Sequence, residues 1–152
     1  MGISIAPSTA EDMEPWIDMR HALWPEGSRA EHREEAESLL RNPRQDSICL
    51  IARDTHGACG FAEIALRHDY VNGCDTSPVA FLEGIYVAPE ARQQGVARAL
   101  VAAAEAWAAE QGCTEFASDA AIDNLESAAM HRALGFEETE RVVYFRKVLA
   151  EA

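Results

Sequence analysis

The sequence predicts an α+β domain in which helices flank a mixed, splayed β-sheet. Apolar, β-branched stretches are gathered in the middle of the chain, at 47–53, 59–66 and 79–87. Segments with helical periodicity precede and follow them. With 152 residues, of which 48% are apolar, the chain can bury a core of its own, and we expect one domain covering residues 1–152.

The N-terminal part of the chain predicts a short strand and two helices. Residues 4–6 fit a strand that a proline ends. Apolar side chains at i, i+3 and i+7 spacing predict a helix over 12–23, which Pro25 stops. The pattern Ser28-Arg-Ala-Glu31 is a capping box, so we expect a second helix to begin there and to run to Arg41.

The rest of the chain predicts three strands, a helix, a strand, a helix and two last strands. A turn at 55–57 joins the first two of these strands into a hairpin. Eight alanines between 97 and 109 give the following helix a narrow face that can pack closely against a sheet. The complete order is β-α-α-β-β-β-α-β-α-β-β. After the strand at 79–87, the expected bounds are 96–110 for the helix, 115–118 for the strand, 125–134 for the helix, and 137–140 and 142–147 for the last strands.

The charge balance narrows the classes of partner. Acidic residues outnumber basic ones, 26 to 13, and the formal net charge is −13. Nucleic-acid binding depends on Lys and Arg that neutralise phosphates, so we expect no nucleic-acid partner. An acidic surface attracts cationic ligands and speeds their encounter. The alternative is that the excess acid only keeps the protein soluble.

Several features predict a reduced, cytoplasmic protein. The four cysteines are scattered without metal-ligand spacing, and three of them lie in or beside predicted strands, where a cysteine most often acts as a small buried hydrophobe. No run of about 18 apolar residues occurs, so we expect no membrane partner. The first residues lack the basic and apolar regions of a secretion signal. The cysteines are Cys49, Cys59, Cys74 and Cys113.

The most informative segment is a strand, a turn and a helix start at 81–98. It reads Phe81-Leu-Glu-Gly-Ile-Tyr-Val-Ala-Pro-Glu-Ala-Arg-Gln-Gln-Gly-Val-Ala-Arg98. Gly95 opens the helix among small neighbours, and a helix start presents unpaired N–H groups and the positive end of the helix dipole. The segment therefore predicts a site for phosphate or pyrophosphate. The alternative is that Gly95 only begins a helix and that no anion binds there.

Two spaced motifs carry a family resemblance. The first is Arg92-x-x-Gly95-x-Ala97, and the second is Asn124-x-x-Ser127-x-x-Met130-His131-x-x-x-Gly135-Phe136. They resemble the acyl-CoA loop and a later segment of the GNAT superfamily of N-acetyltransferases, whose element order is also the one expected here. The resemblance implies acetyl-CoA as the co-substrate and no metal.

More closely, the chain resembles the bacterial aminoglycoside 6′-N-acetyltransferases. This resemblance implies direct attack of the 6′-amine of an aminoglycoside on the thioester of acetyl-CoA, antibiotic resistance as the outcome, and a homodimer built partly from the C-terminal strands. The segments that carry it are Leu23-Trp24, Tyr70-Val-Asn-Gly73, Thr76-Ser-Pro78, Phe81-Leu-Glu-Gly-Ile-Tyr-Val87, Cys113-Thr-Glu-Phe-Ala-Ser-Asp119 and Val142-Val-Tyr-Phe145.

The resemblance also assigns residues to the cofactor. Asn124 would reach the pantetheine arm, with an N-cap of the next helix as the alternative. Gly84 in mid-strand marks a bulge, which would splay the sheet and aim an N–H at the thioester carbonyl. The implied pyrophosphate contacts are the backbones of Gln93, Gln94, Gly95, Val96, Ala97 and Arg98, and the implied pantetheine contacts are Ile85, Tyr86 and Val87.

The amine must lose a proton before it attacks. An aliphatic ammonium of pKa near 9 to 10 is handicapped by roughly 3 to 4 kcal/mol at pH 7. The resemblance places the Glu83 and Asp119 carboxylates beside substrate amines, where either could take the proton directly or through water. The alternative is that both are strand-end carboxylates facing solvent, and the choice of base stays open, with a water chain as a third route.

The residues that would set substrate specificity, and the group that would protonate the leaving thiolate, each have more than one possible role. Trp24 either stacks on a sugar ring or belongs to the core. Tyr70 is a candidate hydrogen-bond partner of the substrate. Glu140 either meets a second amino group or is a solvated charge. His131 stands where many family members have a tyrosine that is thought to protonate the CoA thiolate, so this histidine or solvent would do so.

Two other functions compete with aminoglycoside acetylation. One is acetylation of a polyamine or another small endogenous amine. The other is a non-catalytic sensor that binds acyl-CoA without transferring the acyl group. The combination of Glu83, Gly84, Asn124 and Asp119 argues against a silent sensor.

Overall fold

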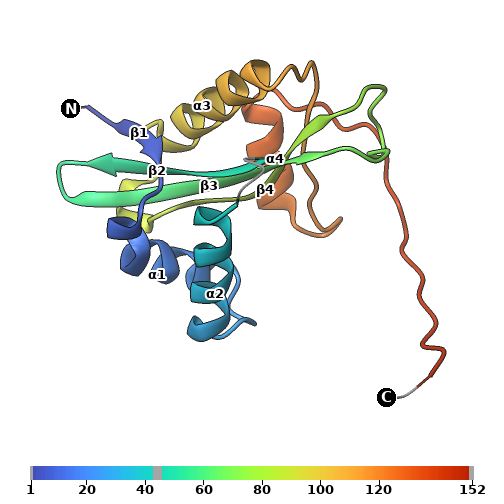
Figure 1. Ribbon diagram of the computed structural model, residues 1–152. Coiled ribbons are helices and arrows are strands. Elements are labelled where there is room, and N and C mark those ends of the chain that lie inside the picture. The colour runs from blue at the N-terminus through green and yellow to red at the C-terminus, as the bar shows by residue number, and fades with distance from the viewer. Residues whose placement is uncertain (1, 43–45, 151–152) are drawn as a thin grey trace. The chain divides into compact units, whose positions relative to one another are not determined.

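The computed structural model describes residues 2–42 and 46–150 and divides the chain into two units, one ending at Asp119 and the other beginning at Ala120 (Figure 1). The single domain expected for residues 1–152 stays a prediction.

The first unit is built on one mixed β-sheet of five strands in the order β1-β2-β3-β4-β5. Neighbouring strands are antiparallel except for β4 and β5, which are parallel. The α+β class and the mixed sheet are therefore confirmed. The strands are β1 (Ser4–Pro7), β2 (Ser47–Asp54), β3 (Gly57–Arg67), β4 (Val79–Val87) and β5 (Phe116–Ala117).

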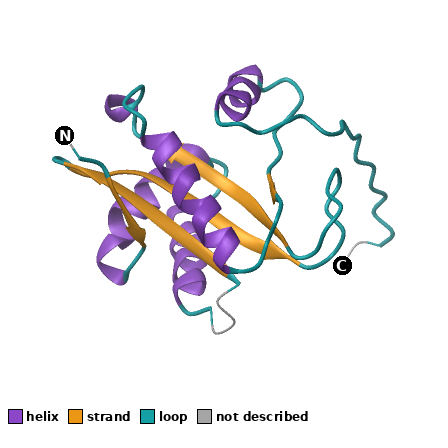
Figure 2. Ribbon diagram, turned by 90° about the horizontal axis from the view of Figure 1, so that it is seen from above, coloured by secondary structure: helices purple, strands orange, loops and turns teal. Residues whose placement is uncertain are grey.

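Helices cover both faces of this sheet. In Figure 1, α1 (Met13–Leu23) and α2 (Arg29–Leu40) lie on one face, and α3 (Val96–Glu110) lies on the other. Figure 2 views the molecule from above and shows α3 lying over the strands of the sheet. Short 3₁₀ helices precede α1 (η1, Ala10–Asp12) and the α3 loop (η2, Pro89–Ala91). The predicted capping box forms at the start of α2, where Glu31 N donates to Ser28 Oγ and Ser28 N to Glu31 Oε1.

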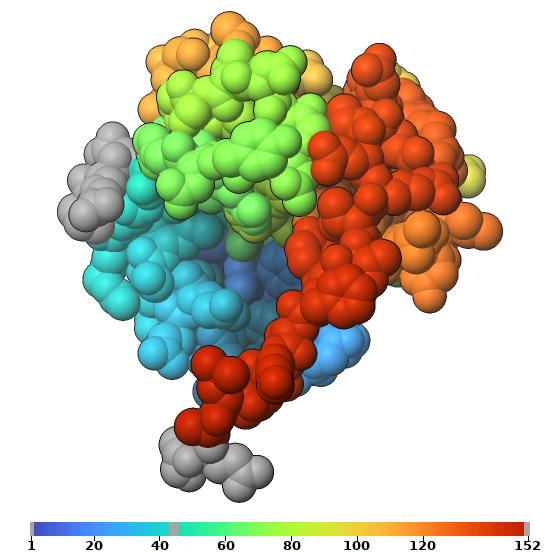
Figure 3. All heavy atoms as spheres, turned by 90° about the vertical axis from the view of Figure 1, so that its right-hand side faces the viewer, coloured from blue at the N-terminus to red at the C-terminus, as the bar shows by residue number. Residues whose placement is uncertain are grey.

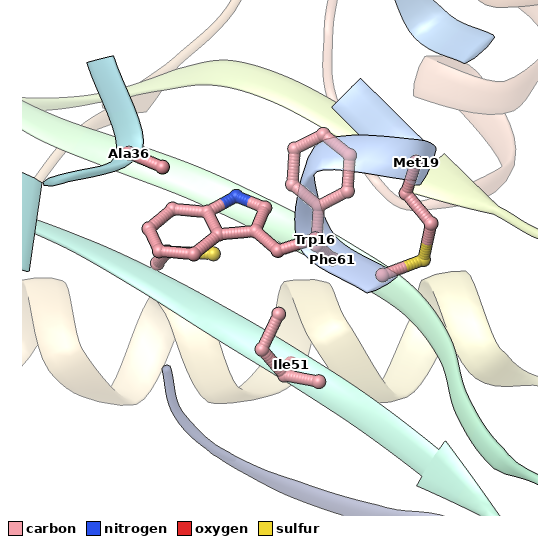
Figure 4. Packing of buried hydrophobic residues seen from close by; sticks show 6 residues of the cluster. Trp16, Met19, Ala36, Ile51 and Phe61 are labelled. Atoms are coloured by element: carbon pink, nitrogen blue, oxygen red, sulfur yellow. The ribbon is translucent and has the colours of Figure 1, made fainter. Parts of the chain in front are cut away.

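A buried cluster joins the α1–α2 layer to the sheet. The alternation of side chains along a strand places Phe61 toward this layer, while a side chain at Gly60 would meet Leu100 of α3. Trp16 on α1 is completely buried. Figure 4 shows the packing of Trp16, Met19, Ala36, Ile51 and Phe61, to which Cys49 also belongs.

The sheet splays along β4. Strand β5 is only two residues long, shorter than the expected 115–118, and pairs with β4 at Ala80 and Phe81 alone. On the other edge of β4 the register with β3 shifts, because Glu63 pairs with Gly84 but Ile64 pairs with Leu82. Glu83 is thus the extra residue of a β-bulge. The bulge predicted at Gly84 is confirmed.

Gly84 has a second role that the sequence did not reveal. A Cβ atom at this position would lie 2.4 and 2.6 Å from two ring carbons of Trp24. The indole therefore packs directly on the backbone of β4 at the bulge. Only glycine permits this approach, because real Cβ contacts do not come so close.

The second unit contains one helix, α4 (Leu125–Ala133), and the strands expected at 137–140 and 142–147 are wrong. Residues 137–150 contain no regular secondary structure and run as an extended chain (Figure 3). Their side chains are exposed, including those of Val143, Tyr144 and Phe145. A strand is stable only when its backbone groups pair with another strand, and this unit contains no strand among its described residues.

Gly84→Ala tests the contact between the indole and β4. The added methyl would overlap Trp24, so we expect the free energy of unfolding in urea to fall by about 1 to 3 kcal/mol. In a Trp24→Ala background the same substitution should have a much smaller effect. Gly2→Ala is the control, because a Cβ at Gly2 meets nothing within 4 Å. An equal loss in both backgrounds would show that backbone conformation, not the indole, requires the glycine.

Candidate functional site

The loop between β4 and α3 has the geometry of an anion-binding helix start. Gly95, the N-cap of α3, has φ +84°, and Gln93 has φ +62°. The first hydrogen bond of the helix runs from Ala99 N to Gly95 O at 3.0 Å. The N–H groups of Val96 and Ala97 come before it, in the first turn, where a helix offers no acceptor of its own. A Cβ at Gly95 would meet nothing within 4 Å, so the backbone conformation, not crowding, requires glycine here.

Side chains in this loop fasten it to its surroundings. Arg92 Nε donates to Val87 O at 2.9 Å, and its guanidinium carbon lies 5.7 Å from the centroid of the Tyr86 ring. Gln94 Nε2 donates to Glu90 O at 3.2 Å. The loop is therefore tied to the end of β4, with Gln93, Gln94, Gly95 and Arg98 exposed.

The C-terminal half of β4 offers one open edge next to this loop. Ile85, Tyr86 and Val87 pair with β3 on one side and are partly buried. On the other side, the described part of β5 ends its pairing at Phe81. The backbone groups beyond that point form an edge to which an extended ligand could add.

An open pocket of about 470 Å³ lies where Trp24 meets the bulge. It brings together two predicted site residues, Trp24 and Glu83, and three further carboxylates. The indole is partly buried, so it belongs to the core and also lines the pocket. The lining residues are Arg20, Trp24, Glu26, Gly27, His32, Glu35, Glu63 and Glu83.

A buried ion pair between Arg20 and Glu63 underlies the pocket, and sequence reasoning missed it. Arg20 and Glu63 are only 4% and 6% exposed. Arg20 Nη1 donates to both Glu63 oxygens, and Trp16 Nε1 donates to Glu63 Oε2 at 2.9 Å. Arg20 Nη2 also reaches Glu35 Oε1 at 3.0 Å. The sequence does contain a sign of this ion pair, because Glu63 lies within an apolar strand and Arg20 lies on the apolar face of a helix.

The same network orients Trp24. His32 Nε2 lies 2.9 Å from Trp24 O, and Arg20 Nε donates to His32 Nδ1 at 3.3 Å. A carbonyl only accepts, so these partners fit the tautomer that carries its proton on Nε2. The imidazole stacks on the indole at 6.4 Å and 20°, and the Arg20 guanidinium carbon lies 4.9 Å from the centroid of the indole ring. The indole is thus held in one orientation at the pocket.

Glu83 is held by an arginine that the sequence analysis did not single out. Arg67 Nη2 donates to both oxygens of Glu83 at 3.0 Å. The guanidinium carbon of Arg67 lies 3.6 Å from the centroid of the Phe81 ring. The candidate carboxylate is therefore half of an ion pair rather than a carboxylate that meets only solvent.

Two of the residues predicted to meet the substrate, both in the first unit, lie outside the lining of this pocket. Tyr70 is 74% exposed in the loop between β3 and β4, and Asp119 is exposed after β5. The loop of Tyr70 is anchored through Glu115, which accepts hydrogen bonds from the backbone N–H groups of Asp75 and Thr76 and from the Thr76 hydroxyl. The roles of Tyr70 and Asp119 stay predictions.

Two of the three predicted residues of the second unit have local hydrogen-bond partners. Asn124 Oδ1 accepts from Ser127 N at 3.0 Å, so the N-cap alternative is confirmed. His131 Nδ1 lies 2.7 Å from Ser127 O and therefore donates to it. Glu140 is exposed. A cofactor or substrate role for each of the three stays a prediction.

The four cysteines are free, and burial raises the pKa of the Cys49 thiol well above its ordinary value. Within 2–42 and 46–150, His, Cys, Asp and Glu side chains form no group of three that could hold a metal ion. The described helices include none long and apolar enough to cross a membrane.

Comparison with known proteins decides the family. Residues 16–136 match the acetyltransferase (GNAT) family. The chain belongs to this family. Its fold agrees, since the crystal structure of the aminoglycoside antibiotic 6′-N-acetyltransferase AAC(6')-IG from Acinetobacter haemolyticus superimposes with a TM-score of 0.91 at 48% identity, covering 97% of this chain and 99% of that one.

Other relatives of this GNAT protein have the same specificity in their names. Aminoglycoside N(6')-acetyltransferase type 1 from Serratia marcescens is 53% identical over 140 residues, which are 91% of this chain and 94% of the relative. The structure of AAC(6')-Iy in complex with the bisubstrate analog CoA-S-monomethyl-acetylneamine has a TM-score of 0.92 at 44% identity, covering 98% of this chain and 100% of that one. The predicted family resemblance is confirmed.

Protonation of Glu115 should release the loop that carries Tyr70. The Thr76 hydroxyl, followed by the backbone N–H groups of Thr76 and Asp75, lowers the pKa of Glu115. A lowered folded-state pKa stabilises the fold above the unfolded-state pKa, near 4.3, and this stabilisation is lost as the pH falls through the folded-state value. We expect Glu115→Gln to lower the free energy of unfolding at pH 7, with the difference from wild type shrinking below about pH 4. Urea unfolding at both pH values measures it, and a difference independent of pH would contradict this role.

Proposed function

We propose that this protein transfers the acetyl group of acetyl-CoA to the 6′-amine of aminoglycosides and thereby confers resistance. The observation that carries the proposal is the placement of Glu83 at the bulge of β4. This single strand offers a main-chain edge beyond Phe81 and, at its bulge, a carboxylate in a pocket with an indole. The names of the relatives, at 44 to 53% identity, support the substrate class.

The chain's own groups fit the co-substrate. The backbones of residues 93–98 would hold the pyrophosphate, since Gly95 is left-handed and its Cα borders open space. Ile85, Tyr86 and Val87 would align the pantetheine arm along the open edge of β4, and Asn124 is proposed as a further contact of the arm. Acetyl-CoA supplies the acetyl group as an activated thioester. The N–H groups at the bulge would stabilise the charge that develops on its carbonyl oxygen.

The carboxylates prepare the amine. An ammonium group is attracted to the acidic pocket, whose lining contains four glutamates and one arginine. Trp24 offers a ring face for a sugar, and Tyr70 and Glu140 are proposed as further substrate contacts. Glu83 and Asp119 bind the amine, and one of them, directly or through water, accepts the proton that the attacking nitrogen loses.

A homodimer in the cytoplasm completes the proposal. The second unit exposes an apolar run that a partner chain would cover, and free thiols are typical of reducing compartments. The C-terminal segment would gain in the dimer the strand partner that it lacks within its own unit. The exposed apolar residues of the run are Val142, Val143, Tyr144, Phe145, Val148 and Leu149.

The acceptor is tested by comparing amines. We expect the purified protein to release free thiol from acetyl-CoA with a kcat/KM for kanamycin-like aminoglycosides well above that for spermidine. A polyamine value about 100-fold higher than the aminoglycoside value, some 2.7 kcal/mol in transition-state binding, would favour the polyamine reading instead. Tight acetyl-CoA binding by calorimetry, with no thiol release over a broad amine panel, would identify a sensor.

Two substitutions test the carboxylates. We expect Asp119→Asn and Glu83→Gln each to lower kcat/KM for an aminoglycoside at least about tenfold, because each removes a charge beside the amine. The dissociation constant of acetyl-CoA should barely move, since backbone groups hold that molecule. Glu90→Gln is the control, because Glu90 is an exposed carboxylate of η2 outside the pocket lining. Unchanged kinetics in both variants would refute the assignment.

A further inference from the structure

Arg67 holds the Glu83 carboxylate from the neighbouring strand. Besides the two bonds from Nη2 at 3.0 Å, Arg67 Nε donates to Glu83 Oε2 at 3.3 Å. The guanidinium also rests on the ring of Phe81, a core residue that is 5% exposed. The arginine is thus fixed by a buried ring on one side and by the carboxylate on the other.

The sheet explains why these three side chains meet. In the ladder between β3 and β4, Arg67 pairs with Val79 and Ala65 pairs with Phe81. Arg67 and Phe81 are therefore diagonal neighbours on one face. The bulge adds Glu83 just beyond Phe81 and re-aims its side chain, which lines the pocket as well as reaching Arg67.

Glu83 keeps acceptor capacity for a second cation. An ionised carboxylate has about four lone-pair sites, and one arginine does not occupy all of them. Arg67 therefore fixes the direction of the carboxylate and partly offsets its charge. A fixed direction favours the reacting geometry, whereas the offset charge weakens the attraction for an ammonium in the ground state.

We propose that Arg67 is a positioning residue of acyl transfer that acts through Glu83. The inference rests on the proposed function, because it takes Glu83 to be the carboxylate that meets the substrate amine. Arg67 keeps this carboxylate in the orientation that the transition state needs, at the expense of some substrate affinity. Arg67 itself is not among the residues that line the pocket.

Arg67→Met tests this role, since methionine keeps an unbranched apolar stem over Phe81 and removes the guanidinium. We expect kcat to fall about tenfold, because Glu83 loses its orientation, while KM for the amine stays the same or falls. Arg67→Lys keeps the charge and should recover part of kcat. A raised KM with unchanged kcat would overturn the proposal, since that is the signature of lost ground-state binding.

A double-mutant cycle separates positioning from a merely structural role. In a Glu83→Gln background, Arg67→Met should change kcat less than about twofold, and independent effects that multiply would overturn the proposal. The control is Arg33→Met, because Arg33 also pairs with a glutamate, Glu14, and its side chain is 43% exposed against 45% for Arg67. It should leave kcat and KM unchanged. The cycle uses whichever amine wild type acetylates best, so a polyamine preference would refute the proposed substrate without deciding the Arg67 result.

Discussion

The close approach of the Trp24 indole to the backbone at Gly84 is the contact on which the candidate site depends. It joins the end of α1 to the centre of β4, at the point where one extra residue enters the strand. Glycine makes the approach possible, and the bulge turns the neighbouring Glu83 into the same pocket. The indole is supported from behind by His32 and Arg20 and edge-on by Phe61, so the whole α1–α2 layer fixes the position of the pocket.

Charge is distributed around this contact in two layers. Beneath the pocket, Arg20 compensates the buried Glu63, which also accepts from Trp16. A buried carboxylate without such partners would be strongly destabilising, so Glu63 needs Arg20 at this depth. At the surface of the pocket, Glu26 is exposed and Glu35 shares the same arginine. The pocket therefore keeps an acidic rim over a neutralised floor, a distribution suited to a cationic ligand.

Strand β4 contributes to the candidate site in two ways. Its backbone offers an edge for an extended ligand, and its side chain at the bulge belongs to the pocket. Among the described residues, no strand pairs with this edge of β4 beyond Phe81, because β5 ends after two residues, so an extended ligand could add there. The side chain at the bulge, Glu83, belongs to the pocket and to the ion pair with Arg67. The proposed reaction would use both contributions of this strand, so that the donor and the acceptor of the acetyl group meet where the sheet opens.

Features that depend only on neighbouring residues could be predicted from the amino-acid sequence. The capping box at Ser28, the helix start at Gly95, the N-cap at Asn124 and the bulge at Gly84 were all predictable, because each is set by residues within a few positions. The two C-terminal strands were not, because local β propensity cannot supply a pairing partner. That Trp24 is both a core residue and part of the pocket follows from the packing of α1 on the sheet. The folded structure also sets two ion pairs. Arg67 and Glu83 are separated by 16 positions in the sequence, and Arg20 and Glu63 by 43 positions. Contacts across such separations follow from strand register and helix packing, which no local pattern in the chain encodes.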